Sequence, residues 1–300
     1  MTREDIIMAN IEKLGDKYCS KYLSYWNKEE LLNNWWTALK FFFSHSFMRG
    51  RRDKLSNEYY YFTLAALKDC FAIDEDQPES SYQKLLGQRD EFNSECILDF
   101  KHSRRIGKGN SIKHNDFKKE IADKNQIISS LIAHKEVEVG WDDKIYKKRI
   151  SLGNDADLMM VLDVLCFITL DLARKNIYNY IKDSMEKNGL TGIYKELRAI
   201  RSIGDKIASF TLRDMLLLNP ELRMFPEDYE KAFPVDTWVI RIAYKLDCRS
   251  ERSEEIKKYF IKRCSEFGVN PFKFNAGIWF LGFHSLDILL ENCLGGKIIE

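Results

Sequence analysis

Apolar residues along most of this chain recur at intervals of three and four positions, the spacing of helices that bury one face. Segments 28–43 and 58–71 are rich in Leu, Trp, Phe and Tyr and predict helices. The polar run 74–81 (DEDQPESS) interrupts this pattern and predicts a loop. The first quarter of the chain is therefore expected to be helical, with short breaks.

A longer helix is predicted after residue 153. Asn154 or Asp155 is a suitable N-cap, and Gly189 is the expected stop. Between them, apolar residues repeat at helical spacing at Leu158, Val161, Leu162, Leu165, Ile168 and Leu172.

The β-pattern is confined to residues 137–152. VEV is followed by GWDD, which predicts a turn, and by IYKKRISL, which alternates in part. We therefore expect an all-α protein with one small β-hairpin.

The stretch Leu197–Ser209 (LRAIRSIGDKIAS) predicts two short helices that meet at a tight turn. Gly204 suits a backbone angle that other residues resist. Unpartnered amides at the start of the second helix form a small anion site, which suits a DNA phosphate. Ser202, Ile203 and Gly204 are the expected phosphate-binding residues. The alternative is an ordinary helical corner with Lys206 as a surface lysine.

A second stretch, Pro234–Arg241 (PVDTWVIR), places Asp236 thirty residues after Lys206. Aspartate is a preferred N-cap residue, and Val239 and Ile240 begin the buried face of the helix that follows. A cap alone would explain Asp236. The hairpin and this stretch together are more specific than either one.

The two stretches resemble the paired signature of the helix-hairpin-helix DNA glycosylase superfamily, whose members cut damaged or modified bases from DNA. The resemblance covers residues 190–295, and the family pattern usually has glycine where this chain has Ser202. In that family, the position of Lys206 is the nucleophile of bifunctional members, and the position of Asp236 is an aspartate in nearly all members. The resemblance therefore implies catalytic roles for Lys206 and Asp236.

The chemistry requires these two residue types. Breaking an N-glycosidic bond develops positive charge on the deoxyribose, which a nearby carboxylate stabilises. A neutral lysine amine can attack the sugar carbon and form a Schiff base, after which the strand is cut by elimination. We expect Lys206 to be buried beside the helix N-terminus, since both effects favour the neutral amine.

A base that is cut must leave the duplex and enter a pocket with a flat apolar wall. Residues 272–290 look like the last helix of the family, where some members stack an aromatic ring on the flipped base. Core packing is the alternative fate of these aromatic side chains. The pocket candidates are Phe283, Trp279, His284 and Trp238, which stands where many relatives have histidine, with His45 and Phe47 as further candidates.

Charge gives no global attraction to nucleic acid, since 47 basic and 46 acidic residues leave a net charge of +1. Two local basic segments, 47–54 and 101–119, are either solvated loops or phosphate contacts. In the first segment the expected DNA-phosphate contacts are Arg49, Arg51 and Arg52.

Seven cysteines are scattered without a C-x-x-C pair, which argues against a zinc ribbon. Only Cys248, Cys264 and Cys293 follow Asp236, too few and too widely spaced for the iron–sulfur loop of many superfamily members. We expect no cofactor, no metal and no cluster. No membrane span or secretory leader is apparent, so a cytoplasmic, nucleoid-associated protein is expected.

The resemblance also implies two lobes around a central DNA cleft, with both chain ends in one lobe. This assigns 1–40 and 207–300 to the lobe with the catalytic aspartate. Residues 41–206 form the other lobe, with the basic loop 101–119, the β-hairpin and the helix-hairpin-helix 197–209 at its end. The protein is expected to act as a monomer on double-stranded DNA that contains a modified base.

The expected activity is base excision with associated β-elimination. The combination of lysine, aspartate and no cluster looks most like the 8-oxoguanine glycosylases, particularly the archaeal type. The insertion 215–233 and the unfamiliar N-terminal half leave other substrates open, namely an oxidised pyrimidine or a modified cytosine of viral DNA removed in anti-phage defence. The further alternatives are a non-catalytic helix-hairpin-helix DNA-binding protein and a helical scaffold.

Overall fold

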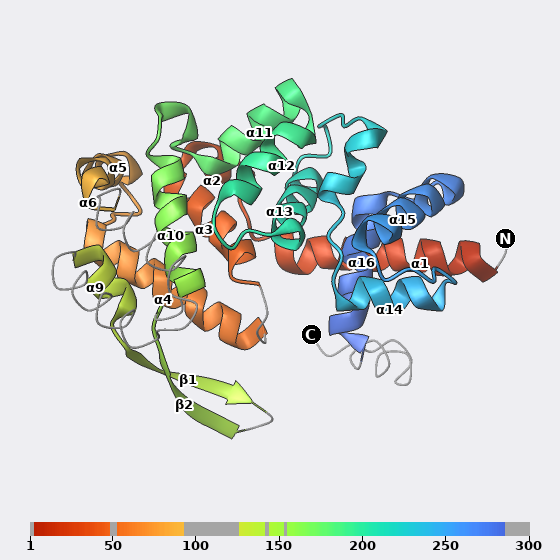
Figure 1. Ribbon diagram of the computed structural model, residues 1–300, viewed down its shortest axis with the longest axis horizontal. Helices are drawn as coiled ribbons and strands as arrows, with labels where there is room; N and C mark the ends of the chain where they lie inside the picture. The colour runs from red at the N-terminus through yellow and green to blue at the C-terminus, as the bar shows by residue number, and fades with distance from the viewer. Residues whose placement is uncertain (1–2, 49–52, 93–125, 142–143, 153–154, 286–300) are drawn as a thin grey trace, which may run out of the picture. The chain divides into compact units, whose positions relative to one another are not determined.

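The computed structural model describes residues 3–48, 53–92, 126–141, 144–152 and 155–285 (Figure 1). These residues are mostly helical, and their only sheet is a two-stranded antiparallel hairpin. The predicted class, all-α with one small β-hairpin, is confirmed. Across the same residues, no helix is both long enough and apolar enough to cross a membrane.

The chain divides into two compact units. The first contains Met1–Lys28, Lys182–Leu197 and Gly204–Glu300, and the second contains Glu29–Ile181 and Arg198–Ile203. The sequence-based division placed its boundaries at residues 40 and 206. The changeovers between the compact units fall after residues 28, 181, 197 and 203.

The second unit is built around a helix that is buried on nearly every side. Helix α10 (Asp155–Ile168) has an apolar run, Leu158–Leu162, that is shielded from solvent. Helix α3 (Trp35–Ser46) adds a second aromatic-rich segment to the core. The other helices of this unit are α2 (Lys28–Asn33), α4 (Asp53–Phe71), α5 (Pro78–Gly87), α6 (Arg89–Phe92), α9 (Gln126–Ile132) and the 3-10 turn η2 (Leu172–Arg174).

Segment 28–43 is not one continuous helix, because Asn34 begins a new one. The Asn34 side chain accepts hydrogen bonds from the amides of Trp36 and Thr37, which makes it the N-cap of α3.

The β-hairpin consists of β1 (Lys135–Trp141) and β2 (Lys144–Ile150). Gly140 pairs with Ile145 and Trp141 with Lys144, so both residues belong to β1. Their predicted place in the turn is wrong. The register places Glu136 opposite Arg149 and Glu138 opposite Lys147. Opposite charges on facing positions favour this pairing.

The long helix predicted from Asn154 or Asp155 to Gly189 is wrong in its middle. Asp155 begins α10, whereas Asn154 lies outside the described residues. The chain leaves the helix after Ile168, and Asp171 accepts a hydrogen bond from the Arg174 amide at the start of η2. Helix α11 (Ile177–Asn188) then starts afresh, and Gly189, with φ +70°, ends it.

The first unit contains the stretch of Asp236 and most of the hairpin's two helices, whereas Arg198–Ile203 belongs to the second unit. Its elements are α1 (Arg3–Tyr18), the π-helical turn η1 (Cys19–Leu23), the end of α11, α12 (Leu190–Ala199), α13 (Asp205–Leu218), η3 (Pro226–Ala232), α14 (Thr237–Lys245), α15 (Ser253–Phe267) and α16 (Pro271–Phe283). The core includes Met8, Phe233, Val239, Phe260 and Phe274. It therefore joins side chains from the beginning of the chain to those from its last described helix.

Helices α1 and α16 lie side by side and approach very closely (Figure 1). A Cβ atom on Gly277 would fall 1.8 Å from the carbonyl oxygen of Ile11, and one on Gly15 would fall 2.0 Å from that of Lys273. Each helix therefore needs a residue without a side chain where the other helix crosses it. This crossing fixes α16, whose Asn275 donates a hydrogen bond to the Pro234 carbonyl.

Replacing Gly277 by alanine should destabilise the protein by about 3 kcal/mol, at the upper end of the usual overpacking cost, because the new methyl group meets backbone. Gly192→Ala in α12 is the matched control. Its Cβ meets nothing within 4 Å, so this change should stabilise the helix by about 0.5–1 kcal/mol. Urea unfolding of both variants measures the difference. Equal stability of the two would contradict the close crossing.

Candidate active site

The turn between α12 and α13 joins two helices, as predicted. The residue with a left-handed backbone in this turn is not the predicted one. Gly204 has φ −87° and ψ −177°, an ordinary extended conformation, so its predicted need for an unusual angle is wrong. Ser202 instead has φ +63°, in the left-handed region that favours glycine. This is the position where the family pattern usually has glycine.

Of the predicted phosphate site, the start of α13 after Gly204 has no side-chain cap. Ser202 and Gly204 are exposed, and Gly204 is the N-cap of α13 without any side chain to cap its first-turn amides. The Ile203 amide, by contrast, donates to the Ile200 carbonyl at 3.1 Å, and the Ile203 side chain is buried. Ile203 is thus a structural residue of the turn, and its amide is already engaged.

Lys206 lies on the first turn of α13 and is exposed. The expectation that its amine is buried is therefore wrong. Lys206 forms no hydrogen bond or ion pair with any residue that the structure describes. Its side chain stands at the surface.

Asp205, the residue before Lys206, is hydrogen-bonded to two neighbouring helices. The buried ammonium of Lys257 donates to both carboxylate oxygens of Asp205 at 3.0 Å, and the Tyr194 hydroxyl donates to the same carboxylate. These contacts join the start of α13 to α15 and to α12. The first turn of α13, and with it Lys206, is therefore fixed to two neighbouring helices.

The insertion 215–233 supports the first helix of the hairpin. Asp228, in η3, accepts hydrogen bonds from the Leu190 amide at 2.9 Å and from the Thr191 hydroxyl at 2.8 Å. Its carboxylate lies so close to Gly189 that a Cβ there would be 2.5 Å away. Asp228 therefore caps α12 from a segment that follows it by almost forty residues.

Asp236 caps α14 as predicted. Its Oδ1 accepts from the amides of Trp238 at 2.9 Å and Val239 at 3.0 Å, and its backbone is extended. Both capping bonds go to the same oxygen, so the cap does not use Oδ2. The residue as a whole is half-buried.

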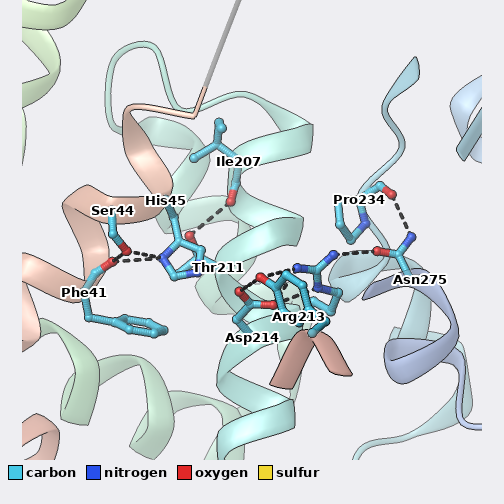
Figure 2. Close-up of polar contacts among 10 residues, drawn as sticks. Phe41, Ser44, His45, Ile207, Thr211, Arg213, Asp214, Pro234 and Asn275 are labelled. Atoms are coloured by element: carbon cyan, nitrogen blue, oxygen red, sulfur yellow. Dashed lines mark hydrogen bonds and ion pairs between the residues drawn. The ribbon is translucent and has the colours of Figure 1, made fainter. Parts of the chain in front are cut away.

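A buried polar network connects α13 to the segment that carries Asp236 (Figure 2). Arg213 donates from Nε to Asp214 at 2.8 Å, from Nη2 to the Tyr18 hydroxyl at 2.9 Å and from Nη1 to Asn275 at 2.9 Å. Asn275 in turn donates to the Pro234 carbonyl at 2.9 Å. Tyr18 completes the network with a 2.5 Å bond to Asp214.

In this network, burial and the charge of Asp214 shift the pKa of Arg213 in opposite directions and that of Tyr18 in the same direction. Burial is the largest single effect on Arg213 and disfavours its charged guanidinium, but Asp214, Tyr18 and Asp236 together outweigh it, so the pKa of Arg213 is raised. Burial, followed by the charge of Asp214, raises the pKa of Tyr18 well above its ordinary value. Asp236 therefore lies within electrostatic reach of Arg213.

Arg213 and Lys206 share a face of α13. They are seven residues apart, which is about two turns or roughly 10 Å along the axis. Arg213 is only 2% exposed, whereas Lys206 is at the surface. The face that contacts the Asp236 segment through Arg213 therefore emerges to solvent at Lys206.

The most exposed aromatic candidate is Phe283, at the end of α16. It is 47% exposed and stacks on Trp279, with ring centroids 5.0 Å apart and planes 7° from parallel. Trp279 is half-buried and packs edge-on against Tyr18 and Tyr22. Phe283 is thus the exposed end of an aromatic stack whose base lies in the core.

Two other pocket candidates are used for packing. His284 is buried and its Nε2 shares a 2.7 Å hydrogen bond with the Tyr22 hydroxyl. Trp238 lies across Gly282, where a Cβ would meet its ring at 2.2 Å, and Arg241 covers the ring at 4.9 Å. Both contacts hold α16 in place.

The remaining candidates lie in the second unit or outside the described residues. His45 is buried with its Nδ1 2.9 Å from the Phe41 carbonyl (Figure 2), and Phe47 is buried against Phe43. Neither side chain offers a surface to a base. Arg49, Arg51, Arg52 and the basic segment 101–119 lie outside the described residues.

Arg213, Asp214 and Asn275 were missed from the sequence. The signal was available: Arg213 and Asp214 are an adjacent charged pair inside an otherwise apolar run (FTLRDMLLL), and Asn275 interrupts another (FKFNAGIWF). Charged residues at buried positions are normally paired.

Among the described residues, no three His, Cys, Asp or Glu side chains are grouped so as to hold a metal ion. Comparisons of this chain with protein-family models, with curated proteins and with solved structures gave no match.

Proposed function

We propose that this protein is a DNA glycosylase that flips out and excises a damaged or modified base, and that Lys206 then cleaves the strand through a Schiff base. The observation that carries this proposal is the arrangement within the first unit. Lys206 lies on the first turn of α13, and the same helix face is joined through Arg213 and Asn275 to the segment of Asp236.

The exposure of Lys206 is consistent with a large substrate. A duplex on this surface would cover the amine and exclude water from it. Exposed Arg241 and Lys245 on α14 supply further positive charge near Asp236, in a chain whose overall charge is almost zero. The uncapped first-turn amides of α13, which follow Gly204, would hold a phosphate.

In the proposed reaction, the flipped base stacks on Phe283 and Asp236 stabilises the positive charge that develops on the sugar. The Nζ lone pair of Lys206 forms a bond to C1′, while the glycosidic electron pair leaves with the base, which takes up a proton. Ring opening gives the Schiff base. Loss of a C2′ proton then expels the 3′ phosphate, and water releases the enzyme.

The test is a panel of duplexes that each carry one modified base, scored separately for free base and for strand nicks. 8-Oxoguanine is the first substrate to try, followed by oxidised pyrimidines and by the bulky modified cytosines of viral DNA. Release of base from one duplex, with a borohydride-trapped adduct on abasic DNA, is the expected result. Tight duplex binding without either product would instead identify a non-catalytic DNA-binding protein.

A further inference from the structure

We infer that Asn275 and Arg213 are positioning residues that set the Asp236 carboxylate relative to the Lys206 amine. This inference rests on the proposed function, and concerns how the two catalytic groups are held together. Neither positioning residue touches the sugar. Both act through the Pro234 carbonyl, two residues before Asp236.

The first step is the orientation of Asn275, which is fixed from both sides. Its Oδ1 accepts from Arg213, which can only donate, and its Nδ2 donates to a carbonyl, which can only accept. A flipped amide would lose both bonds. Asn275 is 1% exposed, so water cannot replace them. The Pro234 carbonyl is therefore held in one place.

The second step is that the Arg213 guanidinium is held in place, so it cannot follow a shift of the Asn275 amide. Asp214 and Tyr18 fix its guanidinium with three bonds, and the rings of Tyr18 and Phe210 lie 4.8 and 4.6 Å from its central carbon. A buried ion pair is a poor source of stability, since apolar side chains of similar volume often serve as well or better. Its value here is geometric, because a planar fork transmits one orientation to Asn275.

The third step is that Arg213 belongs to the helix that carries Lys206. The hydrogen bonds from α13 to Pro234 therefore fix the position of Asp236 relative to the helix that carries the Lys206 amine. Displacement of a reacting group by about 1 Å can cost on the order of 100-fold in rate. A side chain that fixes this loop should therefore affect the step that uses the carboxylate.

The decisive variant is Asn275→Asp, which keeps an acceptor for Arg213 but places an oxygen opposite the Pro234 carbonyl. We expect single-turnover base release to fall about 100-fold. Duplex affinity and borohydride trapping on preformed abasic DNA, which need the amine and not the carboxylate, should change less than about threefold. Arg213→Lys, which keeps the buried charge without the fork, should show the same split and serves if Asn275→Asp does not fold.

Asn219→Asp is the matched control. Asn219 is equally buried in the same unit and donates to the Met215 carbonyl at 2.8 Å, at the far end of α13 from Lys206. It should lower the melting temperature similarly but leave the ratio of base release to trapping unchanged. The inference is wrong if Asn275→Asp or Arg213→Lys releases base at the wild-type rate. It is also wrong if either variant loses base release and trapping to the same extent, so that their ratio stays unchanged as in the control. A wild-type protein with neither reaction contradicts the proposed function itself.

Discussion

Asp236→Asn should reduce base release at least 100-fold, and leave duplex binding intact. Asparagine retains Oδ1, which accepts both capping bonds from Trp238 and Val239, and asparagine is as good an N-cap as aspartate. The fold of α14 is therefore preserved, and only the negative charge is lost. Removing a single group that stabilises transition-state charge typically costs about 100- to 1,000-fold in rate. Single-turnover release of the modified base, measured with saturating enzyme, reports this loss directly.

Asp236→Ala is the comparison that separates the cap from the charge. It removes both and should also cost about 1 kcal/mol of stability. Asp236→Asn should bind the duplex at least as tightly as wild type, because a negative charge close to the phosphates is gone. If Asp236→Asn releases base at the wild-type rate, Asp236 is only a helix cap.

Lys206→Gln should eliminate the adduct that borohydride traps on abasic DNA. The amide of glutamine cannot form a Schiff base, so the loss should be complete within detection. Stability should change by less than about 0.5 kcal/mol, because Lys206 is exposed and has no partner among the described residues. Gel analysis of trapped protein–DNA complexes measures the adduct, and urea unfolding verifies the fold.

Lys195→Gln is the matched control for charge. Lys195 is an exposed lysine on α12, the other helix of the hairpin, so its loss changes the net charge equally. This variant should be trapped as efficiently as wild type. A trapped adduct with Lys206→Gln would assign the nucleophile to another amine. Intact base release by a wild-type protein that is never trapped would make the enzyme a monofunctional hydrolase.

The predictions from local pattern succeeded where local pattern determines the structure. The helical class, the β-hairpin and the capping role of Asp236 all depend on neighbouring residues. The long helix to Gly189 failed between Ile168 and Ile177 because the apolar spacing continues through a segment whose Asp171 competes for the backbone amides. Helical periodicity alone does not reveal such a competition.

The site was less predictable because its contacts join distant parts of the chain. Arg213 binds Tyr18, 195 residues away, and Asn275, 62 residues away. No spacing rule connects such positions. The left-handed residue at Ser202 is a further example, since Gly204 is the residue with the higher local preference for that conformation. Exposure of Lys206 likewise depends on how α13 is packed.

The close crossing of α1 and α16 also determines when the proposed enzyme can be completed during synthesis. Most of the second unit is continuous in the chain, and it can fold while the ribosome is still adding residues. The first unit cannot, because α1 must wait for Gly277, more than 250 residues later, before it finds its packing partner. The nascent chain thus carries an unfinished N-terminal helix until α16 has left the exit tunnel. Asn275, which joins the helix of Lys206 to the segment of Asp236, lies on α16 and therefore reaches its place only at this late stage.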